Sequence, residues 1–460
     1  MADNKRANVP QKNAPAPANP RMTAYRVLMQ VEGEGGYANI ALNAALQNVS
    51  LAPRDKAFVT RLVYGVLENS DCLDHVISSY ARAGAAIEPE VRCLLRMAVY
   101  QMAFLDTPDA AAVNETVNLA KKRKLFRATG FMNGLLRSFI RDGKQIRLPD
   151  AEKEPDLYLS VKHSCPLWLV KRWRAAYGGE ICEKILTSLA GRPPLFARVN
   201  TTKTTSGDLL RDLAAEGVEA ALFDELPDCL LLSHTGAVQE TAAFRRGAFH
   251  VQDGSSQLCC LLAAPKPGDI VIDVCAAPGG KSFTLAELMG DSGKVMACDL
   301  HPHRVKLIAD GAARLGLQSV QAVVRDALSE DGRESCADLV LCDVPCSGLG
   351  ILRRKPDIKH KPQSEIEALP PLQYAILEAS ARLVKAGGRL IYSTCTLNPA
   401  ENGDVIGKFL AAHTEFEPCS LALPQGIFRA IDEPDYMVTV FPHMADTDGF
   451  FISAVRRRTN

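Results

Sequence analysis

The chain has 460 residues, of which 14 are cysteines, and its 53 Lys and Arg balance 53 Asp and Glu. The length predicts two or three domains. Cysteine at about 3% is far below the content of a disulfide scaffold, so we expect a reducing, cytoplasmic location. No run of about 18 apolar residues occurs, so we expect no membrane-spanning segment. The net charge of zero is unevenly distributed, because residues 1–150 hold 20 Lys and Arg against 14 Asp and Glu.

The N-terminal third of the chain predicts a tail followed by a helical domain. Residues 1–20 are polar and rich in Pro, Ala and Asn, without the apolar segment of a signal peptide, so we expect a disordered tail. Over residues 21–147, apolar side chains recur at helical spacing, which predicts an all-α bundle with short connections. The first such run is Ala24, Val27, Leu28 and Val31. The expected breaks between helices fall at residues 33–36, 50–53, 84 and 107–108.

Residues 148–248 predict linker helices followed by a small α+β lobe. One helix carries Trp168 and Trp173, and such large aromatic side chains more often anchor a core than stack on bases. The expected strands are residues 197–203, 230–232 and 249–251, and a helix is expected at residues 206–216.

Residues 249–460 predict an α/β domain that begins with a ligand-binding loop. Residues 270–274 form a short apolar, β-branched run typical of a buried strand. The loop that follows is Cys275-Ala276-Ala277-Pro278-Gly279-Gly280-Lys281, and a helix is expected at residues 283–289. The glycines let a ligand approach the backbone without meeting a Cβ atom. The start of the helix directs N–H groups into the same space.

Two aspartates follow the next two expected strands. Residues 294–298 lead to Asp299, twenty residues after Gly279, which is the spacing at which an acidic residue meets ribose hydroxyls in nucleoside-binding βαβ units. Asp299 could instead cap the next helix, which carries Arg304 in its first turn. The strand at residues 320–324 ends near Asp326, where a ligand contact and a turn aspartate fit the sequence equally well.

Two cysteines also follow strands directly. Cys346 lies in Asp343-Val344-Pro345-Cys346-Ser347-Gly348, and Cys395 lies in Ser393-Thr394-Cys395-Thr396-Leu397-Asn398. Because the carboxyl ends of parallel strands face one crevice, we expect both thiols there. One thiol could act as a covalent nucleophile and the other could complete the reaction, although the sequence does not order them. Cysteines inside apolar runs are expected in the core. Those cysteines are Cys259, Cys260, Cys298 and Cys342, and Cys275 fits either packing or the ligand-binding loop.

Further features surround these strands. Arg353-Arg354-Lys355 follows the Cys346 loop at the mouth of the crevice, and this position favours contact with a negatively charged substrate over the usual solvated face. Residues 437–441 and 450–455 predict a closing antiparallel hairpin. No zinc-type CxxC pair occurs, so we expect no metal.

Together, the segments CAAPGGKS, DVPCSGLG and STCTLNPAEN, with Asp299 and Asp326, resemble the S-adenosylmethionine-dependent RNA cytosine-5 methyltransferases of the Sun/Fmu group. The resemblance runs from about Phe249 to the C-terminus and implies a Rossmann-like domain that binds S-adenosyl-L-methionine. The residues that it implies for the cofactor and base site are Cys275, Ala276, Ala277, Pro278, Gly279, Gly280, Lys281, Asp299, Arg304, Asp326 and Asp343.

The same resemblance implies covalent catalysis. C5 of cytosine is a poor nucleophile until a thiolate adds to C6, and this addition divides one difficult step into two easier ones. The resemblance assigns the attack to Cys395, the release to Cys346 and the binding of the base edge to Asp343. Because a free thiol has a pKa of ~8.5, a positive charge must lower it, and Lys281 and the sulfonium are available.

The helical region carries a second resemblance. The strings YRVLMQV, RDKAFVTRLVYGVL, LLRMAVYQMAFL and GFMNGLLR resemble the NusB-type RNA-binding domain over residues 22–141. Coupled to a cytosine methyltransferase, this domain points to the ribosomal RNA small subunit methyltransferase B group. That group implies one cytosine of 16S ribosomal RNA as target, before the ribosome is fully assembled, by a monomer. The alternatives are transfer RNA or 23S ribosomal RNA as substrate, and a non-catalytic RNA-binding or antitermination factor with a vestigial methyltransferase fold.

Overall fold

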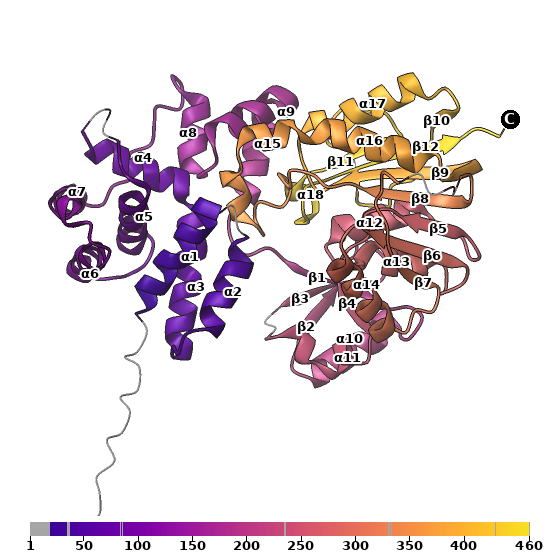
Figure 1. Ribbon diagram of the computed structural model, residues 1–460, viewed down its shortest axis with the longest axis horizontal. Helices are drawn as coiled ribbons and strands as arrows, with labels where there is room; N and C mark the ends of the chain where they lie inside the picture. The colour runs from indigo at the N-terminus through magenta and orange to yellow at the C-terminus, as the bar shows by residue number, and fades with distance from the viewer. Residues whose placement is uncertain are drawn as a thin grey trace, which may run out of the picture. The chain divides into compact units, whose positions relative to one another are not determined.

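The computed structural model (Figure 1) describes residues 19–459, except residues 35, 36, 83, 85, 234, 235, 330, 331, 333 and 428. The chain divides into two compact units, Met1–Asp150 and Ala151–Asn460. The tail expected over residues 1–20 lies outside the described residues up to residue 18, and Pro20 already begins the first helix. None of the described helices is long and apolar enough to cross a membrane.

The first unit is all helical, as its periodicity predicts. Its helices are α1 (Pro20–Glu34), α2 (Ala38–Gln47), α3 (Pro53–Glu68), α4 (Ser70–Tyr80), α5 (Pro89–Ala103), α6 (Asp109–Lys122), the 3₁₀ turn η1 (Phe126–Ala128) and α7 (Thr129–Arg141). Their apolar faces share one core, in which α5 is buried along most of its length. Arg96 of α5 is buried as well, and its guanidinium pairs with Glu32 at 2.6 Å and with Asp74 at 2.5 Å. Two carboxylates therefore hold the buried charge of Arg96.

The second unit begins with two helices and a small antiparallel sheet. The helices are α8 (Pro155–Lys162) and α9 (Leu167–Ser188). The sheet has the order β2-β3-β1-β4, with strands β1 (Leu195–Val199), β2 (Glu219–Leu222), β3 (Cys229–Ser233) and β4 (Phe249–Val251). Its remaining helical segments are α10 (Ser206–Ala215), η2 (Val238–Glu240) and α11 (Ala242–Arg245). Apolar side chains of the sheet, α10 and α11 form a core of their own.

The small lobe differs from the sequence prediction at two strands. The strand expected at residues 197–203 ends at Val199, because the side-chain oxygen of Asn200 accepts hydrogen bonds from the N–H and the hydroxyl of Thr202 and makes a turn. The edge strand β2 was not predicted, because its side chains are mostly exposed and lack apolar alternation. The expected strand at residues 249–251 is present as β4 and pairs with β1, so the small sheet extends to Val251.

A large mixed sheet forms the rest of the second unit, in the order β10-β12-β9-β8-β5-β6-β7, with β11 paired to β12. Its strands are β5 (Ile270–Asp273), β6 (Lys294–Asp299), β7 (Val320–Val324), β8 (Ala337–Asp343), β9 (Val384–Thr394), β10 (Phe416–Pro418), β11 (Met437–Val440) and β12 (Phe450–Arg457). The strands from β9 to β7 pair in parallel. The expected closing hairpin is confirmed, because β11 and β12 pair antiparallel and β12 then pairs antiparallel with β9.

Helices cover both faces of this sheet. The covering helices are α12 (Gly254–Ala263), α13 (Gly280–Leu288), α14 (Pro302–Leu315), α16 (Leu369–Ala381) and α17 (Gly403–Ala412). The other helical segments of this part of the chain are α15 (Gln363–Glu367), α18 (Pro442–Ala445) and the 3₁₀ turns η3 (Pro356–His360) and η4 (Pro399–Glu401). Figure 1 shows α12, α13 and α14 on one face and α16 and α17 on the other. Each face of the sheet has its own apolar core, and successive residues of β5 alternate between them. Val271 lies in the core beside α12, α13 and α14, and Ile272 lies in the core beside α16 and α17. This double burial explains why β5 reads as a continuous apolar run.

The strand order reverses at β5. The chain adds β6 and β7 on one side of β5, and it then adds β8 and β9 on the other side. In an open α/β sheet, the crevice at the carboxyl ends of the strands on either side of such a reversal is the usual ligand site. Every strand-end residue singled out from the sequence lies at the end of one of these parallel strands or just beyond it.

Candidate active site

The loop between β5 and α13 lies at this crevice. Gly279 has a φ of +114°, and a Cβ atom there would lie 2.3 Å from the ring of Phe283, so only glycine fits. Gly280 begins α13, whose first turn directs N–H groups out of the helix end. Ala276, Ala277 and Pro278 complete the loop, and Lys281 is the second residue of α13. Cys275 packs against the core on the α16 side, and burial raises the pKa of its thiol well above the usual value.

Asp273, the last residue of β5, was not singled out from the sequence. Its carboxyl is 1% exposed and accepts a hydrogen bond of 2.7 Å from the hydroxyl of Ser282 in α13. Burial, and then the nearby Asp343, raise the pKa of Asp273 to about 7 against the influence of the Ser282 hydrogen bond. An acidic residue that ends an apolar strand was the available signal.

Asp299 lies at the end of β6, in register with Val324 of β7. One carboxylate oxygen accepts a hydrogen bond of 3.1 Å from the N–H of His301, and the other lies 3.3 Å from Nη1 of Arg304. Arg304 also donates to the carbonyl of Ala277 at 3.3 Å, so it joins the β5 loop to the end of β6. The structure thus brings Asp299 and Arg304 together with the loop.

Asp326 lies two residues beyond the end of β7, at the same edge of the sheet. It is exposed, and its carboxylate accepts a hydrogen bond of 2.9 Å from the N–H of Leu328. This contact is the turn geometry that the sequence allowed, and a ligand contact of Asp326 stays a prediction.

Asp343 and Lys281 meet across the reversal point. Nζ of Lys281 donates to Asp343 at 2.8 Å, and the hydroxyl of Ser393 donates to the other oxygen of Asp343 at 2.8 Å. Burial alone would lower the pKa of Lys281, but the adjacent Asp343 carboxylate raises it above the usual value. Lys281 is therefore a permanent positive charge at the site.

The two strand-end cysteines face each other. Cys346 and Cys395 are both partly exposed, and their sulfur atoms are 3.2 Å apart. The hydrogen bond with Cys395, burial and the negative groups around it raise the pKa of Cys346 well above the usual value. The thiols at the ends of two different strands therefore lie side by side, and the raised pKa keeps the Cys346 thiol protonated.

Glu401 lies behind the cysteines and was not singled out from the sequence. It is fully buried in η4, and its carboxylate accepts hydrogen bonds from the backbone N–H of Ser347 at 2.8 Å and from the Ser347 hydroxyl at 2.5 Å. Gln373 and Asn398 donate to it as well, each at 2.9 Å. The segment NPAEN carries no apolar periodicity, so the only signal in the sequence was an acidic residue close to Cys395.

The Cys395 loop is held from two further sides. Nε1 of Trp173 and the hydroxyl of Tyr177, both in α9, donate to the carbonyl of Leu397 at 3.1 and 3.2 Å. Trp173 is completely buried, so its predicted role as a core anchor is confirmed. Gly350 donates its N–H to the carbonyl of Cys395 at 3.0 Å. A Cβ atom on Gly350 would lie 2.0 Å from the carbonyl oxygen of Gly449, so this close approach requires glycine.

The two arginines of the basic cluster after the Cys346 loop bind other parts of the chain. Arg353 donates to the backbone carbonyl of Arg192 and pairs with Asp446. Arg354 donates to Asp448 and to Asp253, at 2.7 and 2.8 Å. These guanidinium groups bind the chain to itself because carboxylates lie within their reach. Contact of Arg353 and Arg354 with substrate stays a prediction, whereas the expectation that Cys259, Cys260, Cys298 and Cys342 are buried is confirmed.

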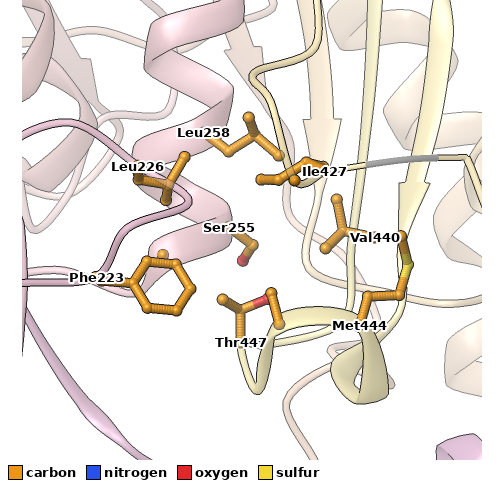
Figure 2. A pocket seen from close by; sticks show the side chains of 11 residues that line it. Phe223, Leu226, Ser255, Leu258, Ile427, Val440, Met444 and Thr447 are labelled. Atoms are coloured by element: carbon orange, nitrogen blue, oxygen red, sulfur yellow. The ribbon is translucent and has the colours of Figure 1, made fainter.

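A small apolar cavity is lined by none of the candidate site residues. Figure 2 shows side chains of Phe223, Leu226, Leu258, Val440 and Met444 around it. Its volume of about 10 Å³ holds about one water molecule. The cavity is a packing defect between the small lobe and the large sheet, and it is too small for a substrate.

The fold and the site define a Rossmann-like methyltransferase with a helical N-terminal domain and a ferredoxin-like lobe. The family described as 16S rRNA methyltransferase RsmB/F matches residues 260–456, the NusB family matches residues 18–141, and the RsmF/B-like ferredoxin-like domain matches residues 165–239. The "Probable ribosomal RNA small subunit methyltransferase B" of Bacillus subtilis is 39% identical over 95% of this chain and 98% of its own length. The ribosomal RNA small subunit methyltransferase B of Sodalis glossinidius is 34% identical over 96% and 98%.

Solved structures agree with this assignment. The crystal structure of PH0851 matches 96% of this chain and 99% of its own, with a TM-score of 0.77 and 28% identity. A methyltransferase homolog protein from Pyrococcus horikoshii matches 66% and 99%, with a TM-score of 0.58 and 27% identity. The chain belongs to the RsmB/F family of ribosomal RNA small subunit methyltransferases.

The buried Asp273 should make stability depend on pH. Its pKa is about 7 in the folded protein against an ordinary 3.8, so the unfolded chain loses a proton between pH 4 and pH 7 that the folded protein keeps. Asp273 therefore lowers the free energy of unfolding as the pH rises through this window. Asp273→Asn removes this pH dependence. The free energy of unfolding of the variant should therefore increase relative to that of the native protein as the pH rises, by on the order of 1 kcal/mol per pH unit. Urea titrations at pH 5 and pH 8 measure this, with the exposed Asp310→Asn as control. A stability difference that is the same at both pH values would contradict the raised pKa.

Proposed function

We propose that this protein transfers a methyl group from S-adenosyl-L-methionine to C5 of one cytosine in 16S ribosomal RNA through a covalent cysteine–C6 adduct. The observation that carries the proposal is the pair of thiols, Cys346 and Cys395, 3.2 Å apart beside Asp343 at the point where the strand order reverses. Two thiols suit a reaction in which one group attacks the base and a second group helps to release it.

The residues of the crevice suit the cofactor. S-adenosyl-L-methionine supplies an electrophilic methyl group on a sulfonium. The Gly279–Gly280 turn and the start of α13 offer backbone N–H groups. The Asp299 carboxylate, at the end of the neighbouring strand, offers acceptors for two ribose hydroxyls. Arg304 holds this carboxylate and the loop together, and Asp326 extends the acidic edge.

The protein's own groups account for the chemistry. The thiolate of Cys395 adds to C6 of the cytosine, so that C5 gains the electron density to accept a methyl group. Asp343, whose carboxylate accepts hydrogen bonds from Lys281 and Ser393, binds N3 and the exocyclic amine in this proposal. A base then takes the C5 proton, the C5=C6 double bond forms again and Cys395 leaves C6 as a thiolate, and Cys346 assists this release. The order of the two thiols follows the family resemblance of the loops that carry them.

The first unit suits binding of the RNA. It carries the excess of positive charge and matches the NusB family, and it contains none of the cofactor or cysteine motifs. Basic side chains bind the phosphate backbone of RNA with little regard to sequence. The division of the chain at residues 20/21, 147/148 and 248/249, a cytoplasmic location, action as a monomer and action before ribosome assembly stay predictions. The intact cysteines argue against a vestigial, non-catalytic fold.

Bisulfite sequencing of total RNA tests the function directly. Deleting the gene should abolish 5-methylcytosine at a single position of 16S ribosomal RNA, and the native gene should restore it. A gene carrying Cys395→Ala should not restore it, because the attacking thiol is missing. Loss of the modification in transfer RNA or 23S ribosomal RNA, with 16S unchanged, would replace the proposed substrate.

The two thiols should behave differently when each is removed. Cys395→Ala should abolish turnover and any covalent adduct with RNA that contains 5-fluorocytosine. Cys346→Ala should still attack but release poorly, so an adduct with ordinary RNA should accumulate. Denaturing gel electrophoresis detects both adducts. If Cys395→Ala keeps the adduct and Cys346→Ala loses it, the two roles are reversed.

Asp299 should be needed for cofactor affinity. A buried carboxylate that accepts hydrogen bonds from two hydroxyls is worth ~1.5–3 kcal/mol, so Asp299→Ala should weaken S-adenosyl-L-methionine binding by roughly ten- to a hundredfold. Asp299→Asn keeps an acceptor for the His301 N–H but removes the charge. It therefore distinguishes the role of Asp299 in the turn from its role in binding ribose. Calorimetry measures both, with the exposed Asp310→Ala on the helix that follows as control. If both variants bind S-adenosyl-L-methionine with unchanged affinity, Asp299 only stabilises its turn and does not bind the cofactor.

A further inference from the structure

Glu401 connects the two loops that carry the cysteines. Ser347 directly follows Cys346 and donates both its N–H and its hydroxyl to the Glu401 carboxylate. The Ser347 hydroxyl also lies 2.7 Å from the hydroxyl of Thr396, which directly follows Cys395. One buried carboxylate therefore binds the residue after one cysteine and reaches the residue after the other.

The backbone around Glu401 is fixed on the Cys395 side. The hydroxyl of Tyr392, in β9, donates to the carbonyl of Glu401 at 2.6 Å. The adjacent Asn402 accepts from the Thr394 hydroxyl at 2.6 Å and donates to the carbonyl of Thr396 at 2.9 Å. These bonds flank Cys395 on both sides, so the carboxylate of Glu401 is rigid relative to that cysteine.

Only a carboxylate suits this position. The groups around its two oxygens are donors: the N–H and hydroxyl of Ser347, the amide nitrogens of Gln373 and Asn398, and the hydroxyl of Thr396. A carboxylate accepts at both oxygens, whereas glutamine would direct its NH₂ group at donors on one side. A fully buried charge persists only when such bonds offset the loss of water.

We propose that Glu401 is a positioning residue that holds the Cys346 loop against Cys395, so that the Cys346 thiol stays within reach of the base attached to Cys395. The role of Glu401 in releasing the base rests on the proposed function. Its effect on the distance between the two thiols does not rest on that function, so the geometric effect and the catalytic role can be tested separately.

Cross-linking of the thiols tests the geometry without RNA. Diamide removes two electrons and two protons from a pair of adjacent thiols, which become a disulfide, and is itself reduced to a hydrazine. In the full-length native protein, Cys346 and Cys395 should cross-link readily, and peptide mass spectrometry identifies the linked pair. Glu401→Gln should slow this cross-link at least tenfold. Glu417→Gln, the same change at a side chain that is 42% exposed in β10, should not slow it.

Turnover tests the consequence for catalysis. Glu401→Gln should lower kcat at least tenfold and leave the KM for S-adenosyl-L-methionine within about twofold. An adduct with ordinary RNA should accumulate, as in Cys346→Ala. The double variant Glu401→Gln with Cys346→Ala should be no slower than Cys346→Ala alone, because both changes impair one step. A structural defect without a positioning role would instead raise KM and lower kcat with no adduct.

Ser347→Ala keeps the inference testable if Glu401→Gln does not fold. It removes the 2.5 Å bond to Glu401 and leaves the carboxylate in place. The cross-link should then slow severalfold, with the melting temperature close to that of the native protein. A native cross-linking rate in whichever of the two variants folds would overturn the positioning role. A slowed cross-link in a protein that methylates no cytosine would uphold it and reject the proposed function instead.

Discussion

The parallel pairing of β5 with β8 is the constraint on which the site depends. The pairing sets Asp273 opposite Leu341, so the loop after β5 and the end of β8 leave the sheet side by side. The ion pair between Lys281 and Asp343 closes this junction at 2.8 Å. Because β9 pairs in parallel with β8, the Cys395 loop leaves from the next position along the same edge. A helix packed on each face keeps these strands in register, so the crevice is a property of the core.

Buried charges surround this crevice, and each has a specific partner. Lys281 pairs with Asp343, and Glu401 accepts bonds from both sides of the cysteine pair. Asp273 has a hydroxyl but no cation in direct contact among the described residues, and its pKa is raised accordingly. Removing one partner from such a group leaves an uncompensated buried charge, which is costly. The site is therefore an electrostatic network in which geometry and protonation are set together.

The lobe and helices that precede the large sheet also serve the site. Trp173 and Tyr177 of α9 hold the carbonyl of Leu397, more than 200 positions further along the chain. Arg354 joins the segment after Cys346 to Asp253 at the start of α12. The two arginines that the sequence predicts to contact substrate thus also connect distant segments of the chain.

Local sequence determined the elements and the identity of most site residues. Apolar periodicity predicted the helical bundle, and short apolar runs predicted β5, β6 and β7, because burial on one face or both imposes these patterns directly. Glycine and cysteine at strand ends marked the loops, because a strand end has few other reasons to carry them. Edge strand β2 escaped because exposed residues carry no such pattern.

Only the tertiary structure decided which side chains meet. The 3.2 Å between Cys346 and Cys395 depends on the strand order, which no local pattern encodes. Glu401 and Asp273 are identified as site residues only by their burial in the structure. An acidic residue is usually exposed, and the sequence does not show the hydrogen-bond donors that allow these two to be buried. The carboxylates that bind Arg353 and Arg354 lie in segments almost one hundred positions away or more. Chain order specifies the residues that carry the chemistry, and long-range packing specifies their partners, since hydrogen bonds and ion pairs depend on distance in space.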